Sequence, residues 1–149
     1  MGALFLDTSA IVRRYDASEV GATRVRRACA PSSGHTIYVA RLASVEVASA
    51  LARKEREGTV SVAQRIRLWQ LFRSHWRAQY QVVALPDAAL DEGEQLLFRH
   101  SLRAYDAVHL AAALIVARAA PSLHLEFWTA DRQQAAAARV EKLPVTLLP

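Results

Sequence analysis

Apolar and polar residues along the 149-residue chain follow two alternating periods. Short runs rich in β-branched and aromatic residues predict strands, and longer segments with apolar residues at helical spacing lie between them. The predicted strands are Ala3–Leu6, Thr36–Ala40, Tyr80–Leu85, Leu123–Trp128 and Val145–Leu148. The predicted helices are Ser9–Tyr15, Ser18–Ala30, Ala43–Glu57, Ser61–Gln79, Asp87–His100, Ala104–Ala120 and Arg132–Arg139. Strands that alternate with helices need crossover connections, so the pattern predicts an α/β fold with a central, mainly parallel sheet flanked by helices on both faces.

The ends of several predicted helices carry residues typical of helix termini. Ser18, Ser61 and Asp87 stand at helix starts, where each side chain can accept an unpaired backbone N–H. Gly58 and Pro121 follow helices, at positions where these residues commonly end them. In a parallel sheet of this kind, ligands bind in the crevice beyond the carboxyl ends of the strands, so candidate chemistry is expected there.

The composition predicts one domain, residues 1–149, without a membrane span. At 52% hydrophobic residues, the chain is long enough for one substantial core but short for two. Its most apolar helix still contains an aspartate, a histidine and an arginine, which a membrane span rarely tolerates. The N-terminus leads directly into a predicted core strand without a basic leader, so we expect a cytoplasmic protein. The single cysteine, Cys29, lies among alanines and is expected to be a buried, inert thiol.

The formal net charge of +5 favours an anionic partner. Nearly all of the positive charge is arginine, because Lys54 and Lys142 are the only lysines. The planar donor fork of arginine suits phosphate, which indicates nucleic acid. Richness in alanine and arginine can equally reflect a biased genome, so the charge by itself leaves both explanations open.

Four acidic residues lie at corresponding ends of separate predicted elements. Asp7 ends the first strand and Asp131 follows the fourth, whereas Glu46 and Asp106 lie near the starts of two helices. Each acid alone is explained by helix capping or by a helix dipole, an interaction worth about 0.3–1 kcal/mol. Together in one crevice, the acids would repel one another and take up protons unless a cation neutralised them. Carboxylate oxygens suit Mg²⁺ or Mn²⁺, and one or two such ions can activate a water and stabilise the attacking and leaving oxygens of a phosphodiester.

These residues resemble the successive motifs of the PIN-domain ribonucleases, and among them the VapC-type toxins of bacterial toxin–antitoxin modules. The similarity covers Leu6-Asp7-Thr8-Ser9-Ala10, Glu46 within Val-Glu-Val-Ala-Ser-Ala-Leu, the segment from Arg103 to Ala111, and Thr129-Ala130-Asp131. Each motif is weak by itself, but four in the same order over nearly the whole chain form a fairly specific signal. The resemblance implies a PIN-like fold, a divalent metal held by the acids, and RNA as the usual substrate.

Carried over residue by residue, the resemblance implies that Asp7, Glu46 and Asp106 form the metal-binding and catalytic core, with Asp131 as the more variable fourth acid. We expect metal-activated water to attack the phosphorus in line and to leave 5′-phosphate and 3′-hydroxyl ends. The reason is that no side-chain nucleophile is needed and no histidine pair is available for 2′-hydroxyl chemistry.

Neighbours of the acids are candidates for supporting roles. Thr8, Ser9 and Thr129 can orient a carboxylate or a phosphate through their hydroxyls, although helix capping explains them about as well. His109 lies three residues after Asp106, where the family pattern also tends to carry histidine, and a buried structural hydrogen bond is favoured over a metal ligand. An RNA track, against the alternative of a solvated helix face, is predicted for Arg13, Arg14, Arg24, Arg26 and Arg27.

One predicted helix is rich in large apolar residues. The segment Ser61–Gln79 places Ile66, Trp69, Phe72 and Trp76 at helical spacing, which indicates core packing. The resemblance adds two expected partners, namely a second copy of the chain in a homodimer and a VapB-like antitoxin that binds an apolar groove near the active site.

Two other classes of function stay open from the residues. A PIN-like fold can bind RNA or a protein without cleavage, although retention of all four acids favours catalysis. An aspartate-based phosphatase or phosphoacceptor domain also begins with an Asp after its first strand. It ranks a distant third here, because no second acid follows two residues after Asp7 and neither lysine follows a strand end. Cleavage of DNA is a variant of the nuclease hypothesis.

Overall fold

The computed structural model describes residues 2–149 and contains one five-stranded sheet. Its strands are β1 (Ala3–Leu6), β2 (Thr36–Ala40), β3 (Tyr80–Val83), β4 (Glu126–Thr129) and β5 (Val145–Leu147). All neighbouring strands are parallel, in the order β3-β2-β1-β4-β5. Each strand therefore needs a helical crossover to reach the next, and the predicted parallel α/β fold is confirmed.

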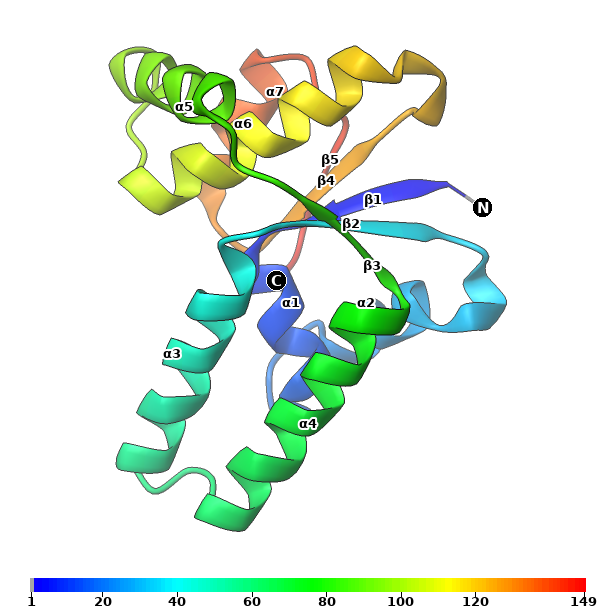
Figure 1. Cartoon of the computed structure of the whole chain (residues 1–149), viewed down its shortest axis with the longest axis vertical. Coiled ribbons are helices and arrows are strands. Elements are labelled where there is room, and N and C mark those ends of the chain that lie inside the picture. Colours follow the sequence, from blue (N-terminus) through cyan, green and yellow to red (C-terminus); the bar gives the residue numbers. More distant parts are fainter. Residues whose placement is uncertain (1) are drawn as a thin grey trace.

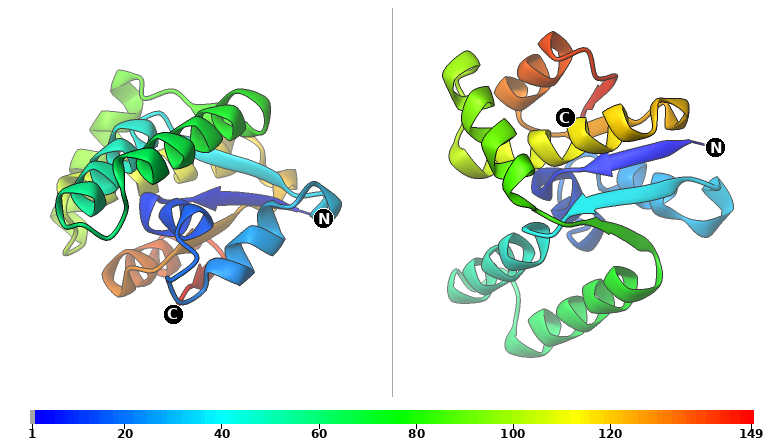
Figure 2. Two further views of the ribbon diagram at one scale, coloured as in Figure 1. Left: turned by 90° about the horizontal axis from the view of Figure 1, so that it is seen from below. Right: turned by 45° about the horizontal axis from the view of Figure 1, so that its top comes forward.

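Helices cover both faces of the sheet and give three layers (Figure 1). On one face lie α1 (Thr8–Tyr15), α2 (Ala22–Cys29), α3 (Ala43–Arg56) and α4 (Val62–Ala78). On the other face lie α5 (Asp87–Arg99), α6 (Ala104–Ala119) and α7 (Arg132–Val140). Figure 2 shows the same layers from two further directions. Each face has its own hydrophobic core, and the sheet separates the two.

The central strand β1 is buried on both faces. Leu4 and Leu6 contribute to the core beneath α1–α4, whereas Ala3 and Phe5 contribute to the core beneath α5–α7. Phe5 stacks on Phe127 of β4 with ring centroids 5.8 Å apart. Successive side chains of a strand point to opposite faces, so a strand covered on both sides needs an uninterrupted apolar run. This is why four consecutive apolar residues before Asp7 identify a central strand.

The connections place the carboxyl end of β1 at a switch point of the fold. From β1 the chain runs outward to β2 and β3 through helices on one face. It then returns through α5 and α6 on the other face and enters β4 on the opposite side of β1. Connections that diverge to opposite faces leave a crevice beyond the strand ends, where ligands of open parallel sheets bind.

The predicted helix start at Ser18 is wrong. The Asp16 carboxylate accepts the backbone N–H of Ser18 at 3.0 Å, which stabilises a turn in place of a first helical turn. Helix α2 begins only at Ala22, after Gly21, whose φ of 89° suits glycine. A polar residue that could cap a helix thus belongs to the preceding loop.

Of the predictions for two other helix starts, one is confirmed and one is wrong. Ser61 caps α4 as predicted, because its hydroxyl accepts the N–H of Gln64 while the Gln64 side chain accepts the N–H of Ser61. Asp87 is not a cap, since it is the first residue of α5 and Pro86 holds the N-cap position. An acid in the first turn still interacts favourably with the helix dipole.

Strand β4 begins three residues later than predicted. Pro121–Leu123 form a 3-10 turn, and His124 has a φ of 48°, so extended pairing starts only at Glu126. The strand gains Thr129 at its end, which brings that residue into the sheet beside the end of β1.

The prediction of core packing for the apolar residues of α4 is confirmed for three of them. Phe72 is fully buried, and Trp69 and Trp76 pack against it. The prediction is wrong for Ile66, which is 41% exposed. Cys29 is buried, as expected. Among residues 2–149, no helix combines the length and apolarity that crossing a membrane requires.

Candidate functional site

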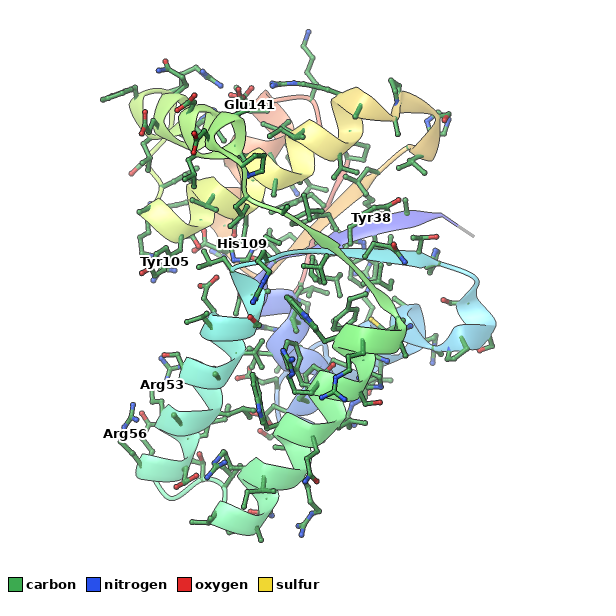
Figure 3. The ribbon with its side chains drawn as sticks, viewed as in Figure 1. Tyr38, Arg53, Arg56, Tyr105, His109 and Glu141 are labelled. Atoms are coloured by element: carbon green, nitrogen blue, oxygen red, sulfur yellow. The ribbon has the colours of Figure 1, made fainter. Side chains whose placement is uncertain are left out.

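A cleft of about 610 Å³ opens beyond the carboxyl ends of β1 and β4. Residues of α1, α3 and α6 and of the turn after β4 line it. In Figure 3, Tyr105 and His109 lie where α6 approaches α3, and Arg53 lies further along α3. The cleft brings together the four acids that the sequence singled out, namely Asp7, Glu46, Asp106 and Asp131.

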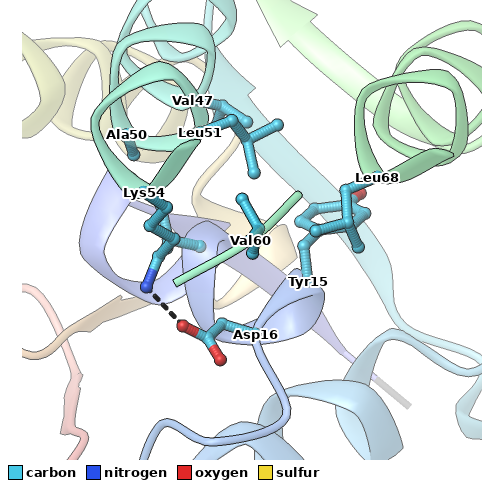
Figure 4. Close-up of a pocket in the computed structure, with 9 residues that line it drawn as sticks. Tyr15, Asp16, Val47, Ala50, Leu51, Lys54, Val60 and Leu68 are labelled. Carbon is cyan, nitrogen blue, oxygen red and sulfur yellow. Dashed lines mark hydrogen bonds and ion pairs between the residues drawn. The ribbon is translucent and has the colours of Figure 1, made fainter. Parts of the chain in front are cut away.

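A second, much smaller cavity lies between α1, α3 and α4 (Figure 4). Its volume is about 40 Å³, and apolar side chains such as Val47 and Leu68 form most of its wall. The ion pair between Lys54 and Asp16 lies at its edge. This cavity has room for only a few water molecules, so the larger cleft is the candidate site.

Asp7 is fixed in orientation by three hydrogen bonds. It is the N-cap of α1 and is 3% exposed. Its Oδ1 accepts the Ala10 N–H at 2.9 Å and the Ser9 hydroxyl at 2.7 Å, and its Oδ2 accepts the Thr129 hydroxyl at 2.7 Å. Burial raises the pKa of Asp7 above its usual value, although His109 and the three hydrogen bonds act in the opposite direction. The ionised form of Asp7 is therefore less favourable in this site than it would be in water.

Glu46, in the first turn of α3, is held by residues from two other helices. Its Oε1 accepts the Thr8 hydroxyl at 2.9 Å and makes a short hydrogen bond with Nε2 of His109. His109 is 1% exposed, and its Nδ1 has no hydrogen-bond partner within residues 2–149. Burial by itself would raise the pKa of Glu46, but His109, Thr8 and the charge of Arg103 together lower it. Glu46 is thus stabilised as a carboxylate, and His109 contacts it directly.

The guanidinium of Arg103 links the remaining two acids. Its Nε donates to Oδ2 of Asp106 at 3.1 Å, and its Nη2 lies 3.6 Å from Oδ2 of Asp131. The hydrogen bond from Arg103 to Asp106 and the nearby charges raise the pKa of Arg103, which stays a cation. Arg103 was not predicted as a site residue from the sequence, although its spacing of three residues from Asp106 is typical of a helical ion pair.

Gln134 is a second residue that the sequence analysis missed. It is fully buried, and its Nε2 donates to the backbone carbonyl of Asp106 at 3.0 Å. Its own N–H donates to Oδ1 of Asp131 at 2.9 Å, and its Oε1 lies 3.1 Å from the Thr129 hydroxyl. It therefore ties α6 and α7 to the end of β4. Its position three residues after the N-cap Asp131 was the available signal.

The hydroxyl residues named beside the acids all contact them. Ser9 accepts the N–H of Ala130 at 2.9 Å while donating to Asp7, and so joins α1 to the turn after β4. Thr129 is fully buried and also accepts the N–H of Asp131 at 3.0 Å. These contacts orient the carboxylates, as residues around a metal site commonly do.

Most of the arginines predicted to contact RNA do not line the cleft. Arg13 lines the cleft, but its guanidinium donates to three backbone carbonyls. The other members of the predicted track lie outside the cleft lining: Arg14, Arg24, Arg26 and Arg27. Arg53 and Arg103, which the sequence analysis did not propose for RNA, line it instead.

The cleft has suitable donors for a hard divalent cation but no ready-made ligand cluster. Across residues 2–149, no three Asp, Glu, His or Cys side chains are close enough together to form a metal site as they stand. Four carboxylates nevertheless face the cleft, and Oε2 of Glu46 and Oδ1 of Asp106 accept no hydrogen bond from this part of the chain. The donor set therefore fits Mg²⁺ or Mn²⁺, provided that the side chains rearrange.

The parallel three-layer fold and the carboxylates in its cleft define an α/β protein with an acidic site at the carboxyl ends of the strands. The family model of the PIN domain matches residues 4–140, and the chain belongs to the PIN-domain family. The family indicated by the four motifs is thus confirmed. A comparison with curated protein sequences gave no match.

Solved structures similar to this chain include several toxin–antitoxin proteins. VapBC2 from Rickettsia felis, bound to a DNA fragment from its promoter, has a TM-score of 0.66 and 9% identity over 99% of both chains. PAE2754 from Pyrobaculum aerophilum has a TM-score of 0.65 and 22% identity over 97% of this chain and 83% of the other. VapC20 from Mycobacterium tuberculosis, named a Sarcin-Ricin loop cleaving toxin, has a TM-score of 0.63 and 17% identity over 90% of this chain and 94% of the other. At these identities the likeness shows a common fold.

Proposed function

We propose that this protein is a divalent-metal-dependent endoribonuclease. The observation that carries the proposal is the convergence of four acids, from four separate elements of a PIN domain, on one cleft. Carboxylates that face one cleft attract a cation, and burial, which raises the pKa of Asp7, makes the ionised form of that acid less favourable still. An acidic cleft in a chain of net charge +5 suits a polyanionic substrate whose cleavage needs bound cations.

In this proposal Asp7, Glu46 and Asp106 hold one or two Mg²⁺ or Mn²⁺ ions, with Asp131 as an additional ligand. The bound ion supplies activation of water and neutralisation of charge on the scissile phosphodiester. Ser9 and Thr129 keep Asp7 oriented, and Thr8 and His109 keep Glu46 oriented and ionised. With water as nucleophile and the 3′-oxygen as leaving group, the products carry 5′-phosphate and 3′-hydroxyl ends.

The proposed biological role is that of a toxin neutralised by a VapB-like antitoxin. It is supported by the fold shared with VapBC2 and with VapC20, the second of which is named a toxin. In this role the protein acts on cellular RNA, assembles as a homodimer, and is inhibited by an antitoxin segment that binds an apolar groove near the cleft. The phosphoacceptor alternative is disfavoured, because both carboxylate oxygens of Asp7 accept hydrogen bonds from inside the protein.

The purified protein tests the nuclease proposal. Wild type is incubated with total bacterial RNA in Mg²⁺, in Mn²⁺, or in EDTA, beside Asp106→Asn and the control Asp91→Asn. Asp91 is exposed on α5 and lies outside the cleft, so its loss removes the same charge elsewhere. Discrete cleavage by wild type and Asp91→Asn, absent in EDTA and in Asp106→Asn, is the expected result. Binding of RNA without cleavage in either metal would instead support a non-catalytic module.

A further inference from the structure

We propose that Arg103 is a displaceable internal counterion, which pairs with Asp106 and Asp131 in the metal-free protein and turns to an RNA phosphate when a divalent cation takes its place. This inference rests on the proposed function, because it assigns a metal-linked movement and a substrate contact to the same cleft. It adds a positioning and substrate-binding residue to the four acids.

Arg103 lies between two of the acids in the cleft. It occupies the N-cap position of α6, and its side chain spans from Asp106 in that helix to Asp131 at the start of α7. One guanidinium thus supplies positive charge to two of the four acids that a metal ion would otherwise neutralise. A cation at that place competes directly with a divalent ion for the same carboxylates.

The exposure of Arg103 makes it easy to displace. Its side chain is 82% exposed, whereas those of Asp106 and Asp131 are 18% and 29% exposed. Ion pairs between exposed groups contribute little, because water screens them and a long side chain loses freedom. Arg13 in the same cleft provides the contrast, since its guanidinium donates to three backbone carbonyls and is anchored. Of the two, Arg103 is therefore the one free to move.

After displacement, the guanidinium remains at the edge of the cleft. It is then a cation without a carboxylate partner, beside the place where a phosphodiester must approach four acids. The planar donor fork of arginine matches two phosphate oxygens, and lysine does not reproduce this geometry. Arg103 thereby links metal loading to substrate binding, because it becomes available to RNA only when an ion has replaced it.

The metal step is tested by titrating the metal-free protein with Mn²⁺ in a calorimeter. The variants are Arg103→Gln and the control Arg139→Gln, which removes one exposed arginine of α7 outside the cleft. Arg103→Gln is expected to bind Mn²⁺ about two- to tenfold more tightly than wild type, as loss of one or two exposed ion pairs allows. Arg139→Gln is expected to match wild type. In wild type, the Nε–H resonance of Arg103 should shift during a Mg²⁺ titration with the same midpoint as ion binding.

The substrate step is tested with a fluorescein-labelled single-stranded RNA of mixed sequence, with Ca²⁺ in place of Mg²⁺. Arg103→Gln and Arg103→Lys are expected to bind this probe more weakly than wild type and Arg139→Gln. Equal Mn²⁺ affinity in wild type and Arg103→Gln, with an unmoved Arg103 resonance, would overturn the counterion proposal and leave the nuclease proposal standing. Absence of Mn²⁺ binding in both proteins would overturn the metal-dependent function together with this inference.

Discussion

Replacing Thr129 by valine removes one hydroxyl from the centre of the site and keeps the shape of the side chain. Thr129 is fully buried at the end of β4. Its hydroxyl lies 2.7 Å from Oδ2 of Asp7 and accepts the N–H of Asp131 at 3.0 Å. The variant therefore leaves a buried carboxylate and a backbone N–H each short of one hydrogen bond.

The magnitude follows from these two contacts. A hydrogen bond to a charged group contributes about 1.5–3 kcal/mol, and an N–H left without its partner costs about 1 kcal/mol or more. After partial compensation by the added methyl group, we expect Thr129→Val to lower the free energy of unfolding by about 2–4 kcal/mol. For a chain of this length, that corresponds to a fall in Tm of about 5–15 °C. The loss should be smaller in acid, because the Thr129 hydroxyl stabilises the ionised form of Asp7.

The assay is urea denaturation at pH 7 in EDTA, so that metal binding does not contribute. Thr129→Ser is the matched control, because it keeps the hydroxyl and removes only a methyl group, at a cost of about 1 kcal/mol. The expected order of stability is wild type, then Thr129→Ser, then Thr129→Val. If Thr129→Val is as stable as Thr129→Ser, the hydroxyl does not support Asp7, and the assignment of Thr129 as a positioning residue is refuted.

Three further predictions concern charge in the cleft. Burial raises the pKa of Asp7 above its ordinary value of 3.8, so its ionisation destabilises the fold increasingly as the pH rises through and beyond that value. Asp7→Asn should therefore gain stability relative to wild type between pH 4 and pH 7 in urea denaturation, and a pH-independent difference would contradict this. Mn²⁺ should raise the Tm of wild type but not that of Asp106→Asn, because only an intact ligand set stabilises the fold by binding; equal shifts would place the ion elsewhere. Arg53→Gln should make the slope of log RNA affinity against log salt concentration shallower by about 0.7, which is the value for loss of one phosphate contact. Arg27→Gln, which lies outside the cleft, should leave this slope unchanged. The reverse result would support RNA contact by the arginines of α2.

Much of the fold could be predicted from the sequence because its central strands are buried on both faces. The bounds of β1 and β2 were predicted correctly, since an uninterrupted apolar run has few alternative placements in a parallel sheet. Helix starts were less predictable. Ser18 and Ser61 are the same residue type before a helical segment, yet only Ser61 caps a helix. Ser18 instead donates its backbone N–H to the Asp16 carboxylate, which stabilises a turn.

The candidate acids could be found because their location follows from topology, whereas their partners depend on packing between helices. Asp7 and Asp131 each follow a strand, and the carboxyl ends of neighbouring parallel strands meet at one edge. Arg103 and Gln134 act across the contact between α6 and α7, and nothing in the local periodicity shows that these helices approach one another. The sequence likewise could not show that the arginines of α2 lie outside the cleft, because charge on a helix does not show which way the helix faces.

The most direct test of the nuclease account is the position and chemistry of new RNA ends in cells. Wild type and Asp106→Asn are expressed briefly in a bacterial host, and RNA 5′-phosphate ends are mapped across the transcriptome. The account predicts discrete new 5′-phosphate ends, together with growth arrest, in cells that express wild type and not in those that express Asp106→Asn. If wild type and Asp106→Asn are both soluble, identical maps of RNA 5′-phosphate ends and no growth arrest in either culture would contradict it.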